Sequence, residues 1–168
     1  MIKSWLNDSP QIATSAYVCE TALVIGKVTI DENSGVWPGA VIRGDYGTIR
    51  IGRNTYIEDN CVIHSGILSE IGDNVIIGHS VVVHSAKIGN NVLVASHVTL
   101  LDDVEVGDGC VIAAGALVRP GQKIPPNSMV VGVPGVIKGE VSPKQRELHG
   151  IYLSDYNDLL RQSREMSL

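Results

Sequence analysis

The sequence contains no phenylalanine, and aromatic residues make up only 4 % of its 168 residues. Glycine is frequent instead, with 18 residues, and hydrophobic residues still account for 44 % of the chain. A chain of this length is expected to form one compact unit. We predict a single core made of stacked valine, isoleucine and leucine side chains.

Basic clusters and long apolar runs are also missing. The formal net charge is -5, which argues against binding to nucleic acid. The first residues, MIKSW, do not begin an apolar run of signal-peptide length. We therefore expect a cytoplasmic protein that does not associate with a membrane.

Cysteine is scarce and unpaired in the sequence. Cys19, Cys61 and Cys110 are an odd number and include no CxxC pair, which does not support a disulfide framework or a cysteine metal site. Cys61 and Cys110 take small inward positions of the repeat described next. We predict that they are buried packing residues.

The sequence is rich in one feature, an aliphatic residue at every sixth position. This period matches neither the 3.6 residues of a helical turn nor the alternation of a half-buried strand, and it is typical of a β-solenoid. The repeat is anchored at Ile12, Val18, Val24, Ile30, Val36, Ile42, Ile51, Ile57, Ile63, Ile71, Ile77, Val83, Ile88, Val94, Leu100, Val106, Ile112, Val118, Ile124, Val130 and Val136.

Three repeats complete one coil of a triangular prism, so these twenty-one anchors predict about seven coils. Stacked coils lie about 4.8 Å apart, the usual spacing of neighbouring strands. The interval changes three times: it gains three residues after Ile42, gains two after Ile63 and loses one after Val83. Insertions in solenoids often form loops on the binding face, so we expect function near these breaks.

Polar residues follow the anchors at these breaks. Arg43, His64 and His84 each follow an anchor, three faces apart, so they should form one column on successive coils. Asp59 and His79 each stand two places after an anchor on another corner and should form a second column.

Two histidines stacked one strand spacing apart can share a metal, but a third ligand is needed. His79 lies on a different corner, too far around the same chain to join His64 and His84. A cyclic homotrimer would bring that corner of one subunit beside the histidine pair of the next. We predict three such sites per trimer, each with three imidazoles and an open fourth position, as in catalytic zinc sites.

The other two histidines are less informative, because histidines at solenoid corners are often plain polar residues. His97 stands three places after an anchor and close to the second column. His97 could line a pocket, but we favour the interpretation that it is an ordinary corner residue. His149 lies in the C-terminal segment without an evident partner, and we give it no role.

Short motifs surround the two columns. They are Arg43-Gly44-Asp45, Ile49-Arg50-Ile51-Gly52, Glu58-Asp59-Asn60, Val62-Ile63-His64, Ile77-Gly78-His79 and Val83-His84. Together they resemble the gamma-class carbonic anhydrase family of left-handed β-helix trimers, over nearly the whole chain. The spacing of the three histidines is the specific part, because many acyltransferases share the six-residue repeat. The segment around Pro134 is similar to the turn that ends the coil in both groups.

The resemblance implies an all-β fold, a left-handed parallel β-helix in which His64, His79 and His84 hold Zn²⁺, or alternatively Fe²⁺ or Co²⁺. It implies hydration of CO2 to bicarbonate by a metal-bound hydroxide at the interfaces of a homotrimer. Asp59 would lie near the bound water and, with Glu58, would orient it.

Other residues receive roles from the same resemblance. Arg43 and Asp45 would form an ion pair between subunits, a role that suits the planar guanidinium. A tail tyrosine lines the site in some relatives. Tyr156 is the nearest candidate here, and Tyr152 fits nearly as well.

The chain departs from the family pattern in places that bear on the reaction. Glu58 replaces the usual glutamine, Ser85 and Ala86 replace Gly-Cys, and His97 lies in a segment that is usually of the Gly-Met-Gly-Ala type. The long acidic loop that supplies a proton shuttle in some members is absent. The alternatives are an acyl-CoA thioesterase or acyltransferase on this scaffold, or a metal-binding trimer without catalysis.

The ladder stops at Val136, so we place the β-helix domain at residues 1–140 and a helical tail at residues 141–168. Ser142, Pro143 and Gln145 predict the start of a helix with a capping box. A break near Ser154 would divide the tail into two helical pieces. The residues predicted to form an apolar stripe against the prism are Leu148, Ile151, Tyr152, Leu159 and Leu160.

Overall fold

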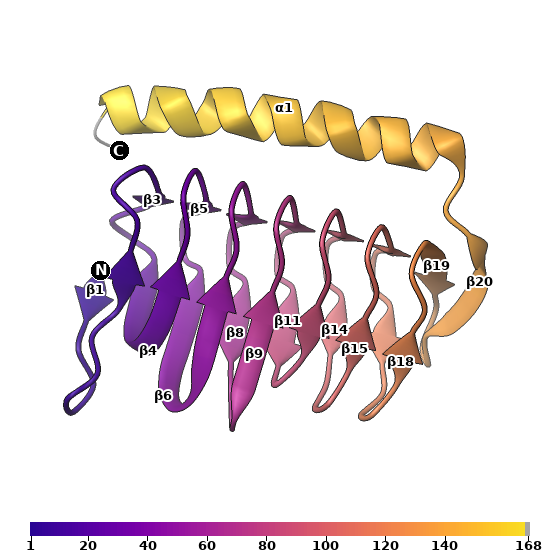
Figure 1. The fold of residues 1–168 in the computed structure, drawn as a ribbon, viewed down its shortest axis with the longest axis horizontal. Coiled ribbons are helices and arrows are strands. Elements are labelled where there is room, and N and C mark those ends of the chain that lie inside the picture. Colours follow the sequence, from indigo (N-terminus) through magenta and orange to yellow (C-terminus); the bar gives the residue numbers. More distant parts are fainter. Residues whose placement is uncertain (167–168) are drawn as a thin grey trace.

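The structure is a computed structural model that describes residues 1–166. It is a left-handed parallel β-helix of about seven coils, with one helix, α1 (Pro143–Met166), lying along one side of the prism (Figure 1). The predicted fold class is confirmed. Within residues 1–166, no helix combines the length and the apolar character needed to cross a membrane.

Most coils contribute one short strand to each of three faces. The first face consists of β3 (Tyr17–Val18), β5 (Gly35–Val36), β7 (Tyr56–Ile57), β10 (Ile76–Ile77), β13 (Leu93–Val94), β16 (Val111–Ile112) and β19 (Ser128–Val131). The second contains β8 (Val62–His64), β11 (Val82–His84), β14 (Thr99–Leu100) and β17 (Leu117–Val118). The third contains β2 (Gln11–Ile12), β9 (Leu68–Ile71), β12 (Lys87–Ile88), β15 (Glu105–Val106) and β18 (Lys123–Ile124).

Two long strands join the second and third faces. They are β4 (Leu23–Ile30) and β6 (Val41–Ile51), and their pairing merges both faces into one 12-stranded sheet. At the N-terminal end, β1 (Ile2–Lys3) pairs in parallel with the beginning of β4. The first face remains a separate 8-stranded sheet that ends in β20 (Val136–Glu140).

The aliphatic anchors stack in register, as the six-residue period predicts. Ile42 pairs with Ile63, Ile63 with Val83 and Val83 with Leu100 along the second face. All four side chains are fully buried. Burying a side chain of this size contributes about 1.5–3 kcal/mol, so the stacked anchors supply the main stabilisation of the prism.

One corner of the prism carries residues in the left-handed backbone conformation, which asparagine and glycine tolerate better than other residues. Their φ angles lie between 49° and 68°. From one coil to the next, this corner is occupied by Asn33, Asn54, Asn74, Asn91, Gly109 and Asn127.

The end of the ladder differs from the prediction. Val136 is exposed and is not an inward anchor, because β20 runs antiparallel to β19. The chain reverses between Val131 and Val136, as expected for the segment around Pro134. The reversal turns the chain out of the prism and leads it to α1.

The tail forms one continuous helix, so the predicted break near Ser154 is wrong. The capping box is confirmed: the backbone N–H of Gln145 donates to Ser142 Oγ at 3.3 Å, and the backbone N–H of Ser142 donates to Gln145 Oε1 at 2.8 Å. These bonds satisfy donors that the first turn of a helix leaves free.

The helix buries a different stripe from the one predicted. Of the five residues expected to face the prism, only Leu160 is buried in the described chain. The observed stripe follows the three- and four-residue spacing of one helix face and includes polar side chains, which is why hydrophobicity alone missed it. It consists of His149, Leu153, Tyr156, Leu160 and Ser163.

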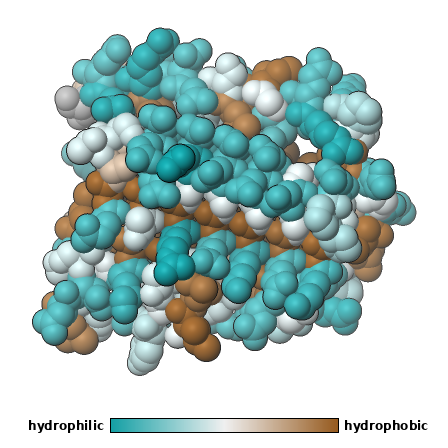
Figure 2. All heavy atoms as spheres, in the orientation of Figure 1, coloured by the Kyte–Doolittle hydropathy of each residue, from teal (hydrophilic) through white to brown (hydrophobic). Residues whose placement is uncertain are grey.

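The surface reflects the alternation of inward and outward side chains. Figure 2 shows rows of polar residues separated by a band of apolar residues that runs along the solenoid beneath α1. The three cysteines, Cys19, Cys61 and Cys110, are buried and free, as predicted.

Two neighbouring leucines of α1 test how the tail is docked. Leu160 is 4 % exposed, whereas Leu159 is 44 % exposed. We expect Leu160→Ala to lower the free energy of unfolding by about 2–4 kcal/mol, because it leaves a cavity under the helix. Leu159→Ala is the matched control, and we expect a change of less than about 1 kcal/mol for it. Urea unfolding at fixed protein concentration measures both values, and equal losses would contradict this docking.

Candidate metal centre

The first predicted column is present on the second face. Arg43 pairs in register with His64, and His64 pairs with His84, on neighbouring strands. The ring centroids of the two histidines are 5.1 Å apart, and the rings are tilted by 51°. The separation is close to one strand spacing, so the parallel register alone brings the two imidazoles together.

A carboxylate from the three-residue insertion holds His64. Asp45 Oδ1 lies 2.9 Å from Nε2 of His64, and Asp45 Oδ2 accepts a hydrogen bond from Arg43. Burial favours a higher pKa for Asp45, but the hydrogen bonds from Arg43 and His64 and the charge of Arg43 outweigh it and lower the pKa. Arg43 and Asp45 thus pair within one chain. The ion pair between subunits stays a prediction.

A second carboxylate, which the sequence analysis missed, holds the other ring. Asp102 Oδ1 lies 2.8 Å from Nδ1 of His84. The one-residue deletion after Val83 is the feature of the sequence that could have predicted this contact. The corner after His84 is one residue shorter than the same corner of the next coil, which contains Asp102.

The second predicted column is also present. Ile77 pairs in register with Ile57, which sets His79 above Asp59. Nδ1 of His79 lies 3.2 Å from Asp59 Oδ2 and 3.7 Å from Glu58 Oε2. The donor atoms of Glu58, Asp59 and His79 lie within 4.8 Å of one another, a cluster that could take part in binding a metal.

Glu58 is unusual because it is a carboxyl group that is almost completely buried. Glu58 is 4 % exposed, and within residues 1–166 its Oε1 atom has no hydrogen-bond partner. Burial raises the pKa of Glu58 to about 7, and the charge of Asp59 adds to the rise, whereas Tyr156, His79 and Trp37 oppose it. Glu58 can therefore gain or lose a proton near neutral pH.

The structure separates the two tail tyrosines. Tyr156 stacks on Tyr56 with a centroid distance of 5.2 Å, and burial together with the charge of Glu58 raises the pKa of Tyr156. The hydroxyl of Tyr56 in turn donates to Asn157 Oδ1 at 2.7 Å. Tyr156 is hydrogen-bonded to Glu58, whereas Tyr152 is exposed, so Tyr156 is the tyrosine that reaches Glu58.

The remaining predicted residue, His97, lies at a corner. It has a φ of 61°, its side chain is exposed, and its backbone N–H donates to the carbonyl of His79. His149, to which we gave no role, is instead buried, and burial lowers its pKa.

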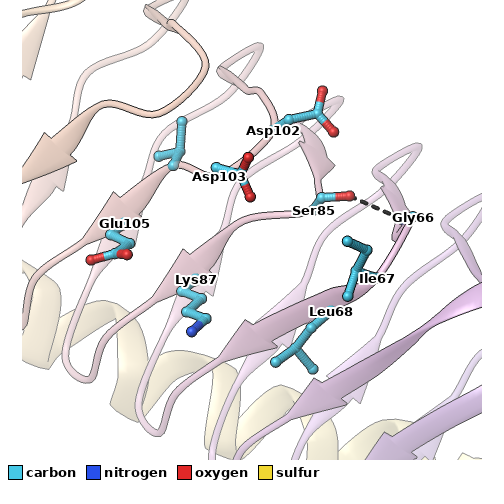
Figure 3. A pocket seen from close by; sticks show the side chains of 9 residues that line it. Gly66, Ile67, Leu68, Ser85, Lys87, Asp102, Asp103 and Glu105 are labelled. Atoms are coloured by element: carbon cyan, nitrogen blue, oxygen red, sulfur yellow. Dashed lines mark hydrogen bonds between the residues drawn. The ribbon is translucent and has the colours of Figure 1, made fainter.

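Two cavities adjoin the columns. One of about 510 Å³ lies against α1 and is lined by Tyr17, Cys19, Glu20, Thr21, Trp37, Pro38, Glu58, Asp59, Leu159 and Ser163. The other, of about 420 Å³, lies beside the corner after His84 (Figure 3) and is lined by Gly66, Ile67, Leu68, Ser85, Lys87, Asp102, Asp103, Val104 and Glu105. The first combines apolar walls from Trp37, Pro38 and Leu159 with three carboxyl groups, those of Glu20, Glu58 and Asp59.

Comparisons with known proteins bear on this arrangement. Residues 68–101 and 85–120 match the family model described as bacterial transferase hexapeptide (six repeats). A Methanocaldococcus jannaschii protein named "Probable carbonic anhydrase" is 46 % identical over 136 residues, which are 80 % of this chain and 86 % of that protein. The chain belongs to the gamma-class carbonic anhydrase family. By this relationship it is an enzyme of the carbonic anhydrase type, a lyase.

Other members of the family match over shorter stretches. A Geobacillus kaustophilus carbonic anhydrase is 38 % identical over 80 residues, which are 46 % of this chain and 44 % of that protein. The mitochondrial gamma carbonic anhydrase 1 of Arabidopsis thaliana is 41 % identical over 78 residues, which are 42 % of this chain and 28 % of that protein.

Solved structures share the whole fold but carry other names. A Bacillus cereus protein described provisionally as an acetyltransferase has a TM-score of 0.95 and 31 % identity, with 98 % of this chain and 97 % of that chain covered. A hexapeptide transferase family protein from Anaplasma phagocytophilum has a TM-score of 0.93 and 30 % identity, with 96 % of each chain covered.

Membership in the carbonic anhydrase family implies a metal, and the donor atoms fit one. Imidazole nitrogens are the commonest protein ligands of Zn²⁺ and suit other first-row metals. Nδ1 of His84 is bonded to Asp102, so its Nε2 is left to coordinate a metal. His79 is 55 % exposed and can reach beyond its own chain.

The buried carboxyl group predicts a pH dependence of stability for the metal-free protein. The folded state holds the Glu58 proton more tightly than the unfolded state, so its contribution to stability is complete below about pH 4.5 and is lost as pH rises through about 7. A rise in pKa from 4.5 to about 7 at 1.4 kcal/mol per unit corresponds to about 3 kcal/mol.

We therefore expect the free energy of unfolding of chelator-treated protein to fall more between pH 5 and pH 8 than that of the Glu58→Gln variant. Glu147→Gln removes an exposed carboxylate on α1 and should follow the wild-type profile. Urea unfolding at both pH values measures the difference. Parallel profiles for wild type and Glu58→Gln would show that Glu58 is not held protonated in the fold.

Proposed function

We propose that this protein is a homotrimer that hydrates CO2 to bicarbonate at three metal sites, each shared by two subunits. The observation that carries the proposal is the stacking of His64 on His84, with His79 on a different corner beside Glu58 and Asp59. Among the described residues, the three histidines do not form one donor cluster within the chain. A site that uses all three requires a second subunit.

His64 and His84 of one chain and His79 of its neighbour would hold the metal. We propose Zn²⁺, since three imidazoles with an open position are typical of catalytic zinc, with Fe²⁺ or Co²⁺ as alternatives. When bound, such a metal makes water a nucleophile near neutral pH. The M. jannaschii relative, named as a carbonic anhydrase, supports this choice of reaction.

The carboxyl groups beside His79 would handle the proton. Asp59 and Glu58, which lie 3.2 Å and 3.7 Å from Nδ1 of His79, would accept hydrogen bonds from water next to His79 and so orient that water. Oε1 of Glu58, which has no hydrogen-bond partner in the described part of the chain, would take up the proton that hydration of CO2 releases. The Tyr156 hydroxyl would stabilise the ionised form of Glu58, since it opposes the rise in the pKa of that carboxyl group.

A second candidate function is hydrolysis or transfer of a small acyl group from a thioester. The Bacillus cereus structure, with a TM-score of 0.95, supports it, as does the cavity of about 510 Å³ beside Glu58. CO2 is much smaller than this cavity, whereas an acyl chain could lie against Trp37, Pro38 and Leu159. Hydrolysis of acetyl-CoA without CO2 hydration by metal-loaded protein would favour this function.

Hybrid trimers test the shared site. A chain with His79→Ala and a chain with His64→Ala are each expected to form trimers without metal, because every site lacks one ligand. In a trimer that contains both chains, one interface in three combines His64 and His84 of the first with His79 of the second. We expect such hybrids, isolated through two different tags, to recover about one third of the wild-type metal content and CO2 hydration.

The control replaces His97 with alanine, since His97 lies near the second column but outside the proposed site. His97→Ala trimers should keep the wild-type metal content. Elemental analysis and stopped-flow CO2 hydration provide the readouts. Hybrids without metal would show that the site is not assembled from two subunits, and metal without hydration would favour the thioester reaction or a purely structural role.

A further inference from the structure

We propose that Asp102 is a positioning residue that fixes the tautomer and orientation of the His84 ring, so that Nε2 of His84 is the nitrogen presented to a metal. The inference deepens the proposed function and depends on it for the metal. The contact that carries it is the hydrogen bond of 2.8 Å between Nδ1 of His84 and Oδ1 of Asp102.

The path of the chain explains why Asp102 can reach this ring. Val83 stacks on Leu100, and the two coils next reach equivalent corners at Ser85 and Asp103, which have φ angles of 50° and 57°. The N–H of Asp103 donates to the carbonyl of Ser85, which confirms that the corners are aligned. In the coil of Val83, one residue, His84, lies between the anchor and the corner. In the coil of Leu100, two residues lie there.

Asp102 is the additional residue in the coil of Leu100. Because two residues of this coil lie opposite one residue of the coil of Val83, the carboxylate of Asp102 extends over the imidazole of His84. Figure 3 shows that Asp102 and Asp103 come from the same corner but point in different directions. The one-residue deletion after Val83 thus gives the carboxylate its place above His84.

The chemistry of a neutral imidazole makes this contact specific. Such a ring carries one proton, and a carboxylate at Nδ1 favours the form with the proton on Nδ1 and the lone pair on Nε2. Metal-binding histidines commonly donate their second nitrogen to a carboxylate in this way, and loss of the carboxylate typically weakens metal binding 10–100-fold.

The two stacked rings are held through opposite nitrogens. Asp45 contacts Nε2 of His64, whereas Asp102 contacts Nδ1 of His84. Asp102 is about half exposed, so its charge is screened by water and its effect comes from the directed hydrogen bond. Asp103 follows Asp102 in the sequence and carries the same charge. Among residues 1–166, however, no hydrogen bond joins the side chain of Asp103 to His84.

The experiment compares Asp102→Ala, Asp102→Asn and Asp103→Asn. Asp103→Asn is the matched control, because it removes one negative charge at the same corner and asparagine tolerates a φ of 57°. Asp102→Asn keeps an oxygen that can accept the Nδ1 proton and should therefore rescue part of the effect. Circular dichroism and trimer size establish that each variant is folded.

The first readout does not involve metal. In the ¹⁵N-labelled metal-free protein at pH 9, the His84 ring, assigned with a His84→Gln variant, should be protonated on Nδ1 in wild type and in Asp103→Asn. In Asp102→Ala it should shift to the Nε2-protonated form. A His84 tautomer that is unchanged in Asp102→Ala would overturn the proposal, whatever the protein's activity.

The second readout is affinity for Zn²⁺, measured by competition with a chelator. We expect about 10–100-fold weaker binding in Asp102→Ala and a change of no more than about 2-fold in Asp103→Asn. Equal weakening in both variants would show a general effect of charge and would overturn the positioning role. If wild-type protein binds none of Zn²⁺, Fe²⁺ and Co²⁺, the proposed function fails, while the tautomer measurement still decides what Asp102 does.

Discussion

In-register pairing of parallel strands between successive coils is the constraint on which the rest of this structure depends. Each anchor lies directly over the anchor of the coil below, so the aliphatic core forms without large aromatic side chains. The same register stacks every residue that keeps a constant distance from its anchor. His64 and His84 are therefore brought together by backbone pairing, not by an attraction between their side chains.

Changes in coil length add function to this scaffold without interrupting the stack. The strands on both sides of each insertion or deletion remain paired, and the length difference is confined to a corner. One insertion supplies Asp45 to His64, and the shortened corner at His84 leaves room for Asp102. The carboxylates that hold the two rings both come from places where neighbouring coils differ in length.

The C-terminal helix connects the solenoid to the chemistry of Glu58. By packing along the first face, α1 brings Tyr156 against Tyr56 and places Leu159 and Ser163 in the wall of the cavity beside Glu58. The carboxyl group is thereby kept from water, and its pKa rises to about 7. From the sequence we expected the tail to be structural apart from Tyr156, whereas in the structure the packed helix forms part of the site's environment.

The sequence by itself determined the solenoid, its two polar columns and the buried cysteines, because a six-residue period converts distance along the chain directly into position on the prism. It also predicted the capping box of the helix, which involves only neighbouring residues. The tertiary structure alone decided which face of α1 is buried, since hydrophobicity did not reveal that His149 and Ser163 face the prism. It likewise decided that Tyr156 and not Tyr152 reaches Glu58, and that Asp102 holds His84. These contacts depend on the direction of side chains at corners and on the docking of a helix, which sequence spacing does not specify.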